Sequence, residues 1–262
     1  MGFFPSMADE DIWMRDMGDN CECLAACVDD LMIASKNPKA IIDALMGAHK
    51  LKLKGTGPTT FHLGCDYFRD DDGTLCVGPR WYIEKMCDEH TRMFGEAPRL
   101  KHSSPLEKND HPELDDTELL DAAGIQRYQS LIGTLQWTIT LGRIDVAAAV
   151  MSVSSFRVAP RIGHLERLQR ICGCLSKMRH AFIRIRTEEP DFSDLPQKKY
   201  DWARTAYGDV KEEIPHNTPK ALGKRVILSH YKDANLYHDM TTGRAVAGVL
   251  HVMNQAPVDW HT

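Results

Sequence analysis

The sequence predicts an α+β protein in which antiparallel β-hairpins precede a block of helices and a further group of strands. Two short apolar runs flank Cys27-Val-Asp-Asp30, and two strand-like runs flank a second turn that contains Asp72-Gly73, a strong hairpin signal. Between residues 119 and 178 apolar residues recur at helical spacing, and after residue 225 they alternate again. These patterns predict hairpins, helices and a second group of strands along one chain.

The first hairpin is the stretch around which the chain is organised. We expect residues 1–20 to form a loop that enters the sheet. The hairpin then runs from about Cys21 to Ser35, with Asp29 at or near its tip. The anchors expected to fix the entering loop in the core are Phe3, Phe4, Ile12 and Trp13.

Asp29 and Asp30 are the first candidate site. Adjacent carboxylates in a hydrophobic setting are costly because each ionised group resists desolvation and repels the other. A divalent cation offsets that cost, and Mg²⁺ prefers carboxylate oxygens completed by water and substrate phosphates. The alternative is a solvated turn, since Asp is a common turn residue. The tetrapeptide alone leaves both interpretations open.

A helix and a second hairpin follow. Asn37-Pro38 is a helix start, with a capping side chain before a residue that lacks an N–H, and the pattern continues toward Gly55. Strands are expected at 61–68 and 74–78, joined by a turn whose acidic triplet Asp70–Asp72 we interpret as solvated. Pro79 then begins a helix that runs through His90.

The middle of the chain predicts a loop and then three helices. Residues 97–116 are rich in Pro, Ser, Asp and His, which is typical of a loop or linker. Helices are expected at 119–140, at 146–156 with Asp145 as a candidate cap, and at 161–178. Their short connections favour a small helical subdomain.

The last third begins with a stretch that lacks apolar periodicity. Residues 187–224 contain four prolines and are interpreted as a linker or surface insertion, with local order expected around Tyr200-Asp-Trp202. A strand at 225–231 is expected to carry Asp233 at its end, followed by strands at 245–253 and from 258. Taken alone, Asp233 is more typical of a turn residue than of a ligand.

Composition bounds the class of protein. The chain has 262 residues, 43% hydrophobic and 26% charged, which is ordinary for a soluble globular protein. No apolar run approaches the roughly 20 residues that cross a bilayer, and the N-terminus lacks a secretory pattern. We therefore expect an intracellular protein of the cytoplasm or nucleus, neither secreted nor membrane-bound. The eight cysteines lack paired zinc-module spacing, so free buried thiols in a reducing compartment are expected.

Net charge makes uniform attraction to nucleic acid unfavourable. The formal charge is -5, so nucleic-acid binding needs a local basic patch. One concentration of basic residues lies on and after the last predicted helix, and the alternative interpretation is a solvated helix face. The candidate nucleic-acid-binding residues are Arg161, Arg167, Arg170 and Lys177, and the same concentration of basic residues continues with Arg179, Arg184 and Arg186.

Several motifs, in order, resemble a known family. Gly2–Trp13 and the box Cys27-Val-Asp-Asp-Leu-Met-Ile-Ala-Ser35 resemble the reverse transcriptase of copia-type LTR retrotransposons. The later matches to that family are Phe61–Asp66, Tyr128–Gln136 and Arg143–Val150. Near the end, Tyr231–Asp239, Thr242–Arg244 and Val258–Trp260 resemble the start of the family's ribonuclease H domain. The likeness covers nearly the whole chain except about 188–223.

The resemblance implies a domain order and a chemistry. It implies the rear part of a reverse transcriptase palm at 1–96, a thumb- or connection-like helical subdomain at 97–186, a linker or insertion at 187–224, and a truncated ribonuclease H-like sheet at 225–262. It also implies two-ion Mg²⁺ catalysis of nucleotidyl transfer, with Asp29 and Asp30 as catalytic carboxylates. Asp233 would be a ribonuclease H metal ligand. The implied partners are an RNA template, a DNA primer or RNA/DNA hybrid, dNTP and the rest of a Pol polyprotein.

Two departures from the family pattern weaken the expected activity. Cys27 replaces the usual aromatic residue before Val-Asp-Asp and cannot stack in the same way. The family's earlier palm Asp would precede Met1, and its remaining ribonuclease H carboxylates would follow Thr262. We therefore expect a fragment that is inactive in isolation. The alternatives are a catalytically silent nucleic-acid-binding or interaction remnant, and a non-functional translated relic.

Overall fold

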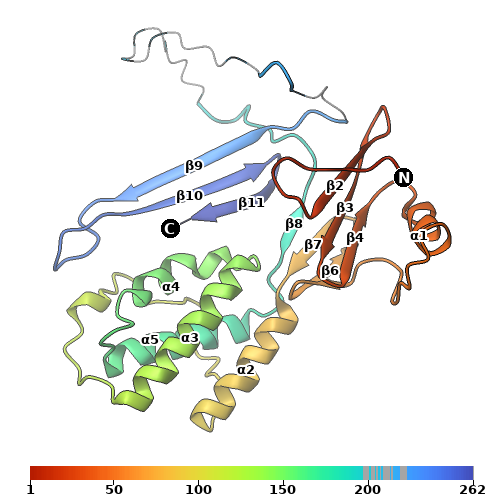
Figure 1. Ribbon diagram of the computed structural model, residues 1–262. Helices are drawn as coiled ribbons and strands as arrows, with labels where there is room; N and C mark the ends of the chain where they lie inside the picture. Colours follow the sequence, from red (N-terminus) through yellow and green to blue (C-terminus); the bar gives the residue numbers. More distant parts are fainter. Residues whose placement is uncertain are drawn as a thin grey trace. The chain divides into compact units, whose positions relative to one another are not determined.

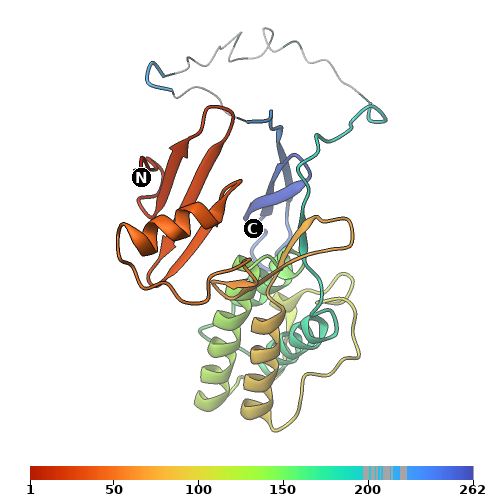
Figure 2. The ribbon, with the colours of Figure 1, turned by 90° about the vertical axis from the view of Figure 1, so that its right-hand side faces the viewer.

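The computed structural model describes residues 1–196, 201, 204, 206, 208, 213, 215–218 and 223–261. The chain divides into two compact units (Figures 1 and 2). The first unit comprises Met1–Pro58 and Glu189–Val226, and the second comprises Thr59–Glu188 and Ile227–Thr262. Among the described helices, none combines the length and apolar character that a membrane crossing requires.

The first unit contains a four-stranded antiparallel sheet in the order β1-β2-β3-β4. Its strands are β1 (Phe4–Pro5), β2 (Ile12–Asp16), β3 (Cys21–Cys27) and β4 (Asp30–Ala34). The predicted hairpin is confirmed, with Cys27 opposite Asp30 in the ladder. The prediction of an entering loop was wrong, because all of β2 pairs with Cys21–Ala25 of β3, and β1 pairs with β2. Phe4 and Trp13 are exposed and anchor no core.

The helix of this unit, α1 (Pro38–Gly47), begins where the sequence predicts. The Asn37 side chain accepts a hydrogen bond from the Ala40 amide at 3.3 Å, and Pro38 occupies the first turn. Ile41 is its buried residue. The helix ends at Gly47, eight residues before the Gly55 expected from the sequence.

The second unit holds another four-stranded antiparallel sheet, in the order β5-β6-β7-β8. Its strands are β5 (Phe61–His62), β6 (Cys65–Arg69), β7 (Leu75–Gly78) and β8 (Ile183–Ile185). The distant strand β8 pairs with β7, which brings Arg184 to the acidic turn. One Arg184 nitrogen lies 2.6 Å from both Asp70 and Asp72. Two members of the acidic triplet thus have a cationic partner, contrary to the solvated turn that we expected.

Helices form the main core of the second unit. They are α2 (Arg80–Phe94), α3 (Ala122–Thr140), α4 (Ala147–Ser154) and α5 (Ile162–Lys177), with 3-10 turns η1 (Pro112–Leu114) and η2 (Ile144–Val146). Tyr128, Leu135, Val150 and Leu168 are fully buried in this core. Ile83 and Met86 of α2 belong to the same cluster, so α2 packs with the helices that follow the predicted boundary at residue 97.

Asp145 does not cap the helix that follows it. Both of its oxygens accept hydrogen bonds from Arg143 at 2.8 Å, and Val146 occupies the cap position of α4. Arg143 is only 2% exposed and also donates to the Met178 carbonyl at 3.1 Å. A buried guanidinium needs such partners, and this requirement explains why the carboxylate turns toward Arg143.

A three-stranded antiparallel sheet completes the second unit, in the order β11-β10-β9. Its strands are β9 (Leu228–Asn235), β10 (Val246–Met253) and β11 (Ala256–His261). The three predicted strands are confirmed, although β9 extends past the expected end. The order predicted around Tyr200-Asp-Trp202 includes residues outside the described part of the chain.

The predicted α+β class is confirmed at this level. The described residues form five α-helices and three antiparallel sheets. The palm, thumb and ribonuclease H labels, and the domain boundaries attached to them, stay predictions.

Candidate functional site

The hairpin tip presents two carboxylates on a tight turn. Because Cys27 pairs with Asp30, only Val28 and Asp29 lie between the paired positions. Two-residue hairpin turns of the favoured types need a positive φ at the first turn position, and Val28 supplies it with φ 53°. A β-branched residue is rare in that conformation. Val28 is also fully exposed, so the tip extends into solvent.

Asp29 and Asp30 are both exposed. Neither carboxylate takes part in a side-chain hydrogen bond or ion pair with the residues that the structure describes. Their oxygens are therefore available to an external ligand. Their exposure also removes the desolvation cost inferred from the apolar flanking sequence.

Glu22, at the end of β3 opposite the hairpin tip, shows the opposite arrangement. It is 5% exposed and accepts hydrogen bonds from Arg15 Nε at 2.9 Å and from the Ser35 hydroxyl. The bond from Ser35, followed by that from Arg15, holds the pKa of Glu22 below its usual value. Glu22 therefore joins β2, β3 and the end of β4, while the two tip aspartates remain available.

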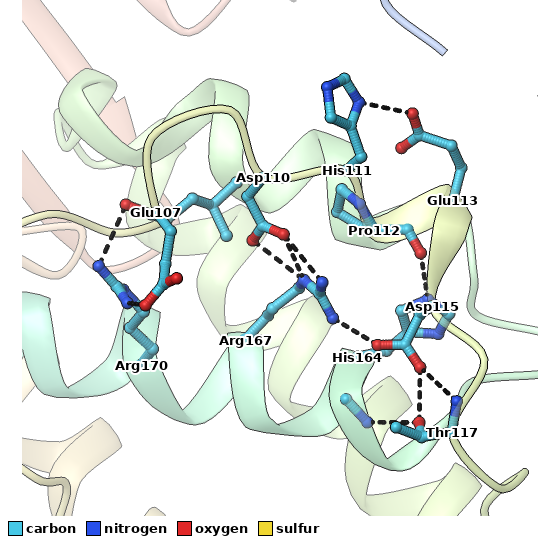
Figure 3. A network of polar contacts seen from close by, with 12 residues as sticks. Glu107, Asp110, His111, Pro112, Glu113, Asp115, Thr117, His164, Arg167 and Arg170 are labelled. Atoms are coloured by element: carbon cyan, nitrogen blue, oxygen red, sulfur yellow. Dashed lines mark hydrogen bonds and ion pairs between the residues drawn. The ribbon is translucent and has the colours of Figure 1, made fainter. Parts of the chain in front are cut away.

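The predicted basic patch lies on α5 and contacts an acidic loop, defined as residues 103–117 (Figure 3). Arg167 donates to Asp110 through Nε at 3.0 Å and Nη2 at 2.8 Å, and to Asp115 through Nη1 at 2.6 Å. Arg170 pairs with Glu107 and donates to the Ser104 carbonyl at 3.1 Å. Both guanidinium groups thus bind the loop.

The other two predicted residues also contact this loop. Lys177 Nζ donates to Ser103 Oγ at 2.8 Å, and Arg161 donates to the Thr117 carbonyl. The structure therefore places Arg161 at the N-cap of α5 and the other three predicted residues on the helix, and it gives each a partner in the acidic loop. Their role in binding nucleic acid stays a prediction.

Sequence reasoning missed the loop carboxylates as partners of α5. A signal was present, because the acid-rich segment around residues 107–116 precedes an arginine-rich helix of opposite charge. Charge complementarity alone does not give the register in which the two segments meet.

His164 anchors the same loop in a defined tautomer. Its Nδ1 accepts from the Arg161 amide at 3.0 Å, so Nε2 is the atom that donates to the Pro112 carbonyl at 2.8 Å. The ring is 3% exposed and stacks on Phe156. Burial, as the largest effect, lowers the pKa of His164. The folded state therefore favours the neutral ring.

This tautomer makes stability depend on pH. In the unfolded chain the His164 ring takes up a proton near pH 6.5, whereas the folded state resists protonation, so stability falls as pH drops below about 6.5. We expect His164→Gln, which does not titrate, to lose less stability than the parent chain between pH 7.5 and pH 5. Urea unfolding at the two pH values measures the difference, and equal losses would contradict this role of His164.

Asp233 lies within β9 opposite Gly248, not at the end of the strand as predicted. It is exposed and belongs to the second unit, whereas Asp29 and Asp30 belong to the first. Across the described residues, no group of three or more His, Cys, Asp or Glu side chains is arranged to hold a metal ion. The two aspartates of the hairpin tip therefore remain a two-carboxylate candidate.

The eight cysteines are free thiols. Four of them are buried, as predicted, and four are half-buried, including Cys27 beside the hairpin tip. Burial, followed by the nearby Asp66 charge, raises the pKa of Cys65 to about 11. That thiol is protonated at neutral pH and acts as a small apolar group.

Comparison with known proteins gives the family context. The chain is 28% identical over 232 residues to the "Putative transposon Ty5-1 protein" of Saccharomyces cerevisiae, a match that covers 87% of this chain and 69% of that protein. Its curated relatives are transposon proteins. The chain is also 24% identical over 175 residues to the "Retrovirus-related Pol polyprotein from transposon RE1" of Arabidopsis thaliana.

The second match covers 65% of this chain and 11% of the polyprotein, so the chain corresponds to a small part of that relative. No family model matches the chain, and no solved structure matches it significantly. The chain is thus similar to a transposon protein and to a small part of a retrotransposon Pol polyprotein.

Proposed function

We propose that the chain derives from the reverse transcriptase region of a copia-type Pol polyprotein, and that the Asp29–Asp30 hairpin is its polymerase cation site. The observation that carries the proposal is the tip itself, with two adjacent exposed carboxylates that have no partner among the described residues. The Pol-related similarity supports the same assignment.

The donor set at the tip fits Mg²⁺. Carboxylate oxygens are preferred ligands of this ion, which usually keeps several waters and takes further ligands from substrate phosphates. Asp29 and Asp30 would hold the cation, and the paired strands β3 and β4 fix the backbone that carries them. When bound, Mg²⁺ supplies activation of the primer hydroxyl and neutralises charge on the leaving pyrophosphate.

In this proposal Cys27, directly before the turn, lies next to the primer. Cys27 is half-buried directly before the turn, where its small side chain supplies little stacking surface for a primer sugar. We therefore expect loose primer positioning and little or no extension by the isolated chain. The proposed partners are an RNA template, a DNA primer and dNTP.

We extend the proposal to Asp233 as a ligand of a ribonuclease H-like site. Its support is its exposure on β9, an edge strand of the three-stranded sheet. Asp233→Asn is expected to leave cation binding at the hairpin tip unchanged, because the two sites belong to different units.

Manganese binding tests the proposal. Mn²⁺ replaces Mg²⁺ at carboxylate sites and is detected by electron paramagnetic resonance. We expect the chain with RNA/DNA hybrid and dNTP to bind Mn²⁺, and the Asp29→Asn, Asp30→Asn double variant to bind less Mn²⁺ than the parent chain. A matched control, Glu10→Gln with Asp43→Asn, removes two exposed carboxylates of the same unit and should bind as the parent does. Equal binding by all three proteins would contradict the proposal.

A second candidate is a catalytically silent nucleic-acid-binding remnant. Two observations favour it, namely Cys27 at the tip and the lack of a third metal-holding side chain in the described residues. Under this alternative, hybrid binding persists in the Asp29→Asn, Asp30→Asn variant, and neither protein extends a primer or binds Mn²⁺ at the tip.

A further inference from the structure

Two cavities of the second unit lie beside the segment that follows α5. The larger, of about 620 Å³, lies beside the Gly142–Asp145 turn, and the smaller, of about 400 Å³, lies beside β6. His180, Ala181 and Phe182 line both cavities. Both cavities therefore lie against residues 177–186, and together they are here called the basic groove.

The walls of the larger cavity carry an excess of positive charge. Arg143, Lys177, Arg184 and Arg186 line it, against one carboxylate, Asp145. Arg143 already donates hydrogen bonds to Asp145 and to the Met178 carbonyl. Arg186 and His180 are exposed, and neither side chain has a hydrogen bond or ion pair to the described residues. An anion in the groove would give them a partner.

Arg184 adds an independent observation. Its Nη2 pairs with Asp70 and Asp72, but its Nε–H is buried without an acceptor among the described residues. A buried guanidinium N–H without a partner is costly, and an anionic oxygen in the cavity would relieve that cost.

The smaller cavity combines aromatic and basic side chains. Tyr67, Phe68 and Phe182 line it together with Arg80 and Arg179. Phe182 is 43% exposed and packs edge to face on Phe68 with ring centroids 4.9 Å apart. Glu84 lies 3.1 Å from Arg80 and 3.8 Å from Arg179, so it offsets part of their charge.

We infer that the basic groove binds single-stranded nucleic acid. Cations that follow a backbone, with an exposed aromatic ring between them, are the combination that holds single strands without sequence preference. Arg186 and His180 would contact phosphates, and Phe182 would stack on a base. The bases of a duplex are already stacked on one another and cannot stack on Phe182. An acidic peptide could bind the cationic side chains, but it has no base that would stack on the ring. The inference deepens the proposed function, because it places its nucleic-acid partner, yet it does not depend on Asp29 or Asp30.

Fluorescence anisotropy with a labelled twenty-nucleotide oligo-dT tests the groove on the full chain. Phe182→Leu keeps apolar bulk and removes the ring, and it should weaken binding about 5- to 150-fold, while Phe182→Tyr should bind as the parent does. Arg186→Gln should reduce the slope of log affinity against log salt by about 0.7. Lys39→Gln, an exposed lysine of α1, is the charge-matched control and should leave the slope unchanged.

The outcomes separate this inference from the proposed cation site. Oligo-dT binding by the Asp29→Asn, Asp30→Asn variant should equal that of the parent, whether or not the variant binds Mn²⁺. The inference that the groove binds single strands is overturned if folded Phe182→Leu and Arg186→Gln proteins bind oligo-dT as the parent does. It is also overturned if polyglutamate, or a duplex of equal length, competes as well as unlabelled oligo-dT. Circular dichroism of each variant establishes that it is folded.

Discussion

Gly173→Ala is expected to destabilise the second unit by about 3 kcal/mol, near the top of the usual range for overpacking. A Cβ on Gly173 would lie 2.1 Å from the backbone oxygen of Arg99. That oxygen cannot rotate away as a side chain can, so either α5 or the segment at Arg99 must shift. Gly173 is buried in α5, and the cost exceeds the gain in helix propensity of up to about 1 kcal/mol.

Gly133→Ala is the matched control for this prediction. Gly133 lies in α3, and a Cβ there would meet no atom within 4 Å. Alanine should therefore stabilise the chain by up to about 1 kcal/mol through helix propensity alone. Urea unfolding of the two variants measures both effects. Similar stability changes at Gly173 and Gly133 would show that α5 does not need the close approach of the Arg99 segment.

Arg167→Met is expected to cost about 3 kcal/mol, because it leaves carboxylates behind in a poorly solvated place. The Asp115 and Asp110 side chains are 6% and 11% exposed, and both bind Arg167. Arg92→Met is the control, since Arg92 and Glu89 form an exposed pair on α2 and such pairs contribute at most about 1 kcal/mol. Thermal and urea unfolding of both variants give the comparison.

The effect of Arg167→Met should depend on pH. Burial raises the pKa of Asp115, but hydrogen bonds from Thr117 and Arg167 outweigh burial and leave that pKa below its usual value. The ion pair therefore stabilises the fold above the unfolded Asp pKa of about 3.9 and loses its effect as pH falls below it. The difference between parent and Arg167→Met should shrink between pH 7 and pH 3. A difference that stays constant would exclude Asp115 as the partner that matters.

The sequence predicted correctly those helices and hairpins that are determined by residues close to one another in the chain. Asn37-Pro38 marks the start of α1 because a capping side chain and a proline act within one turn. The Cys21–Ser35 hairpin is found because alternating apolar residues flank a turn. The strands β1 and β2 were missed, since β2 depends on pairing with β3, and β1 on pairing with β2, rather than on their own alternation.

Long-range contacts decided what the sequence could not predict. The pairing of β7 with β8 joins positions more than a hundred residues apart, and it supplies Arg184 to the turn at Asp70 and Asp72. The same reason applies to the site. The position of Asp29 at a hairpin tip followed from sequence, whereas the binding of Arg167 by Asp110 and Asp115 required the fold of the acidic loop.

Iron-directed cleavage of the backbone tests the central claim most directly. Fe²⁺ replaces Mg²⁺ at carboxylate sites, and with ascorbate and peroxide it generates radicals that cut the chain near the bound ion. With RNA/DNA hybrid and dNTP present, we expect cuts centred on Val28–Leu31, and none there in the Asp29→Asn, Asp30→Asn variant. A parent chain without cuts at Val28–Leu31, or cuts there that persist in the variant, would contradict a cation site at the hairpin tip.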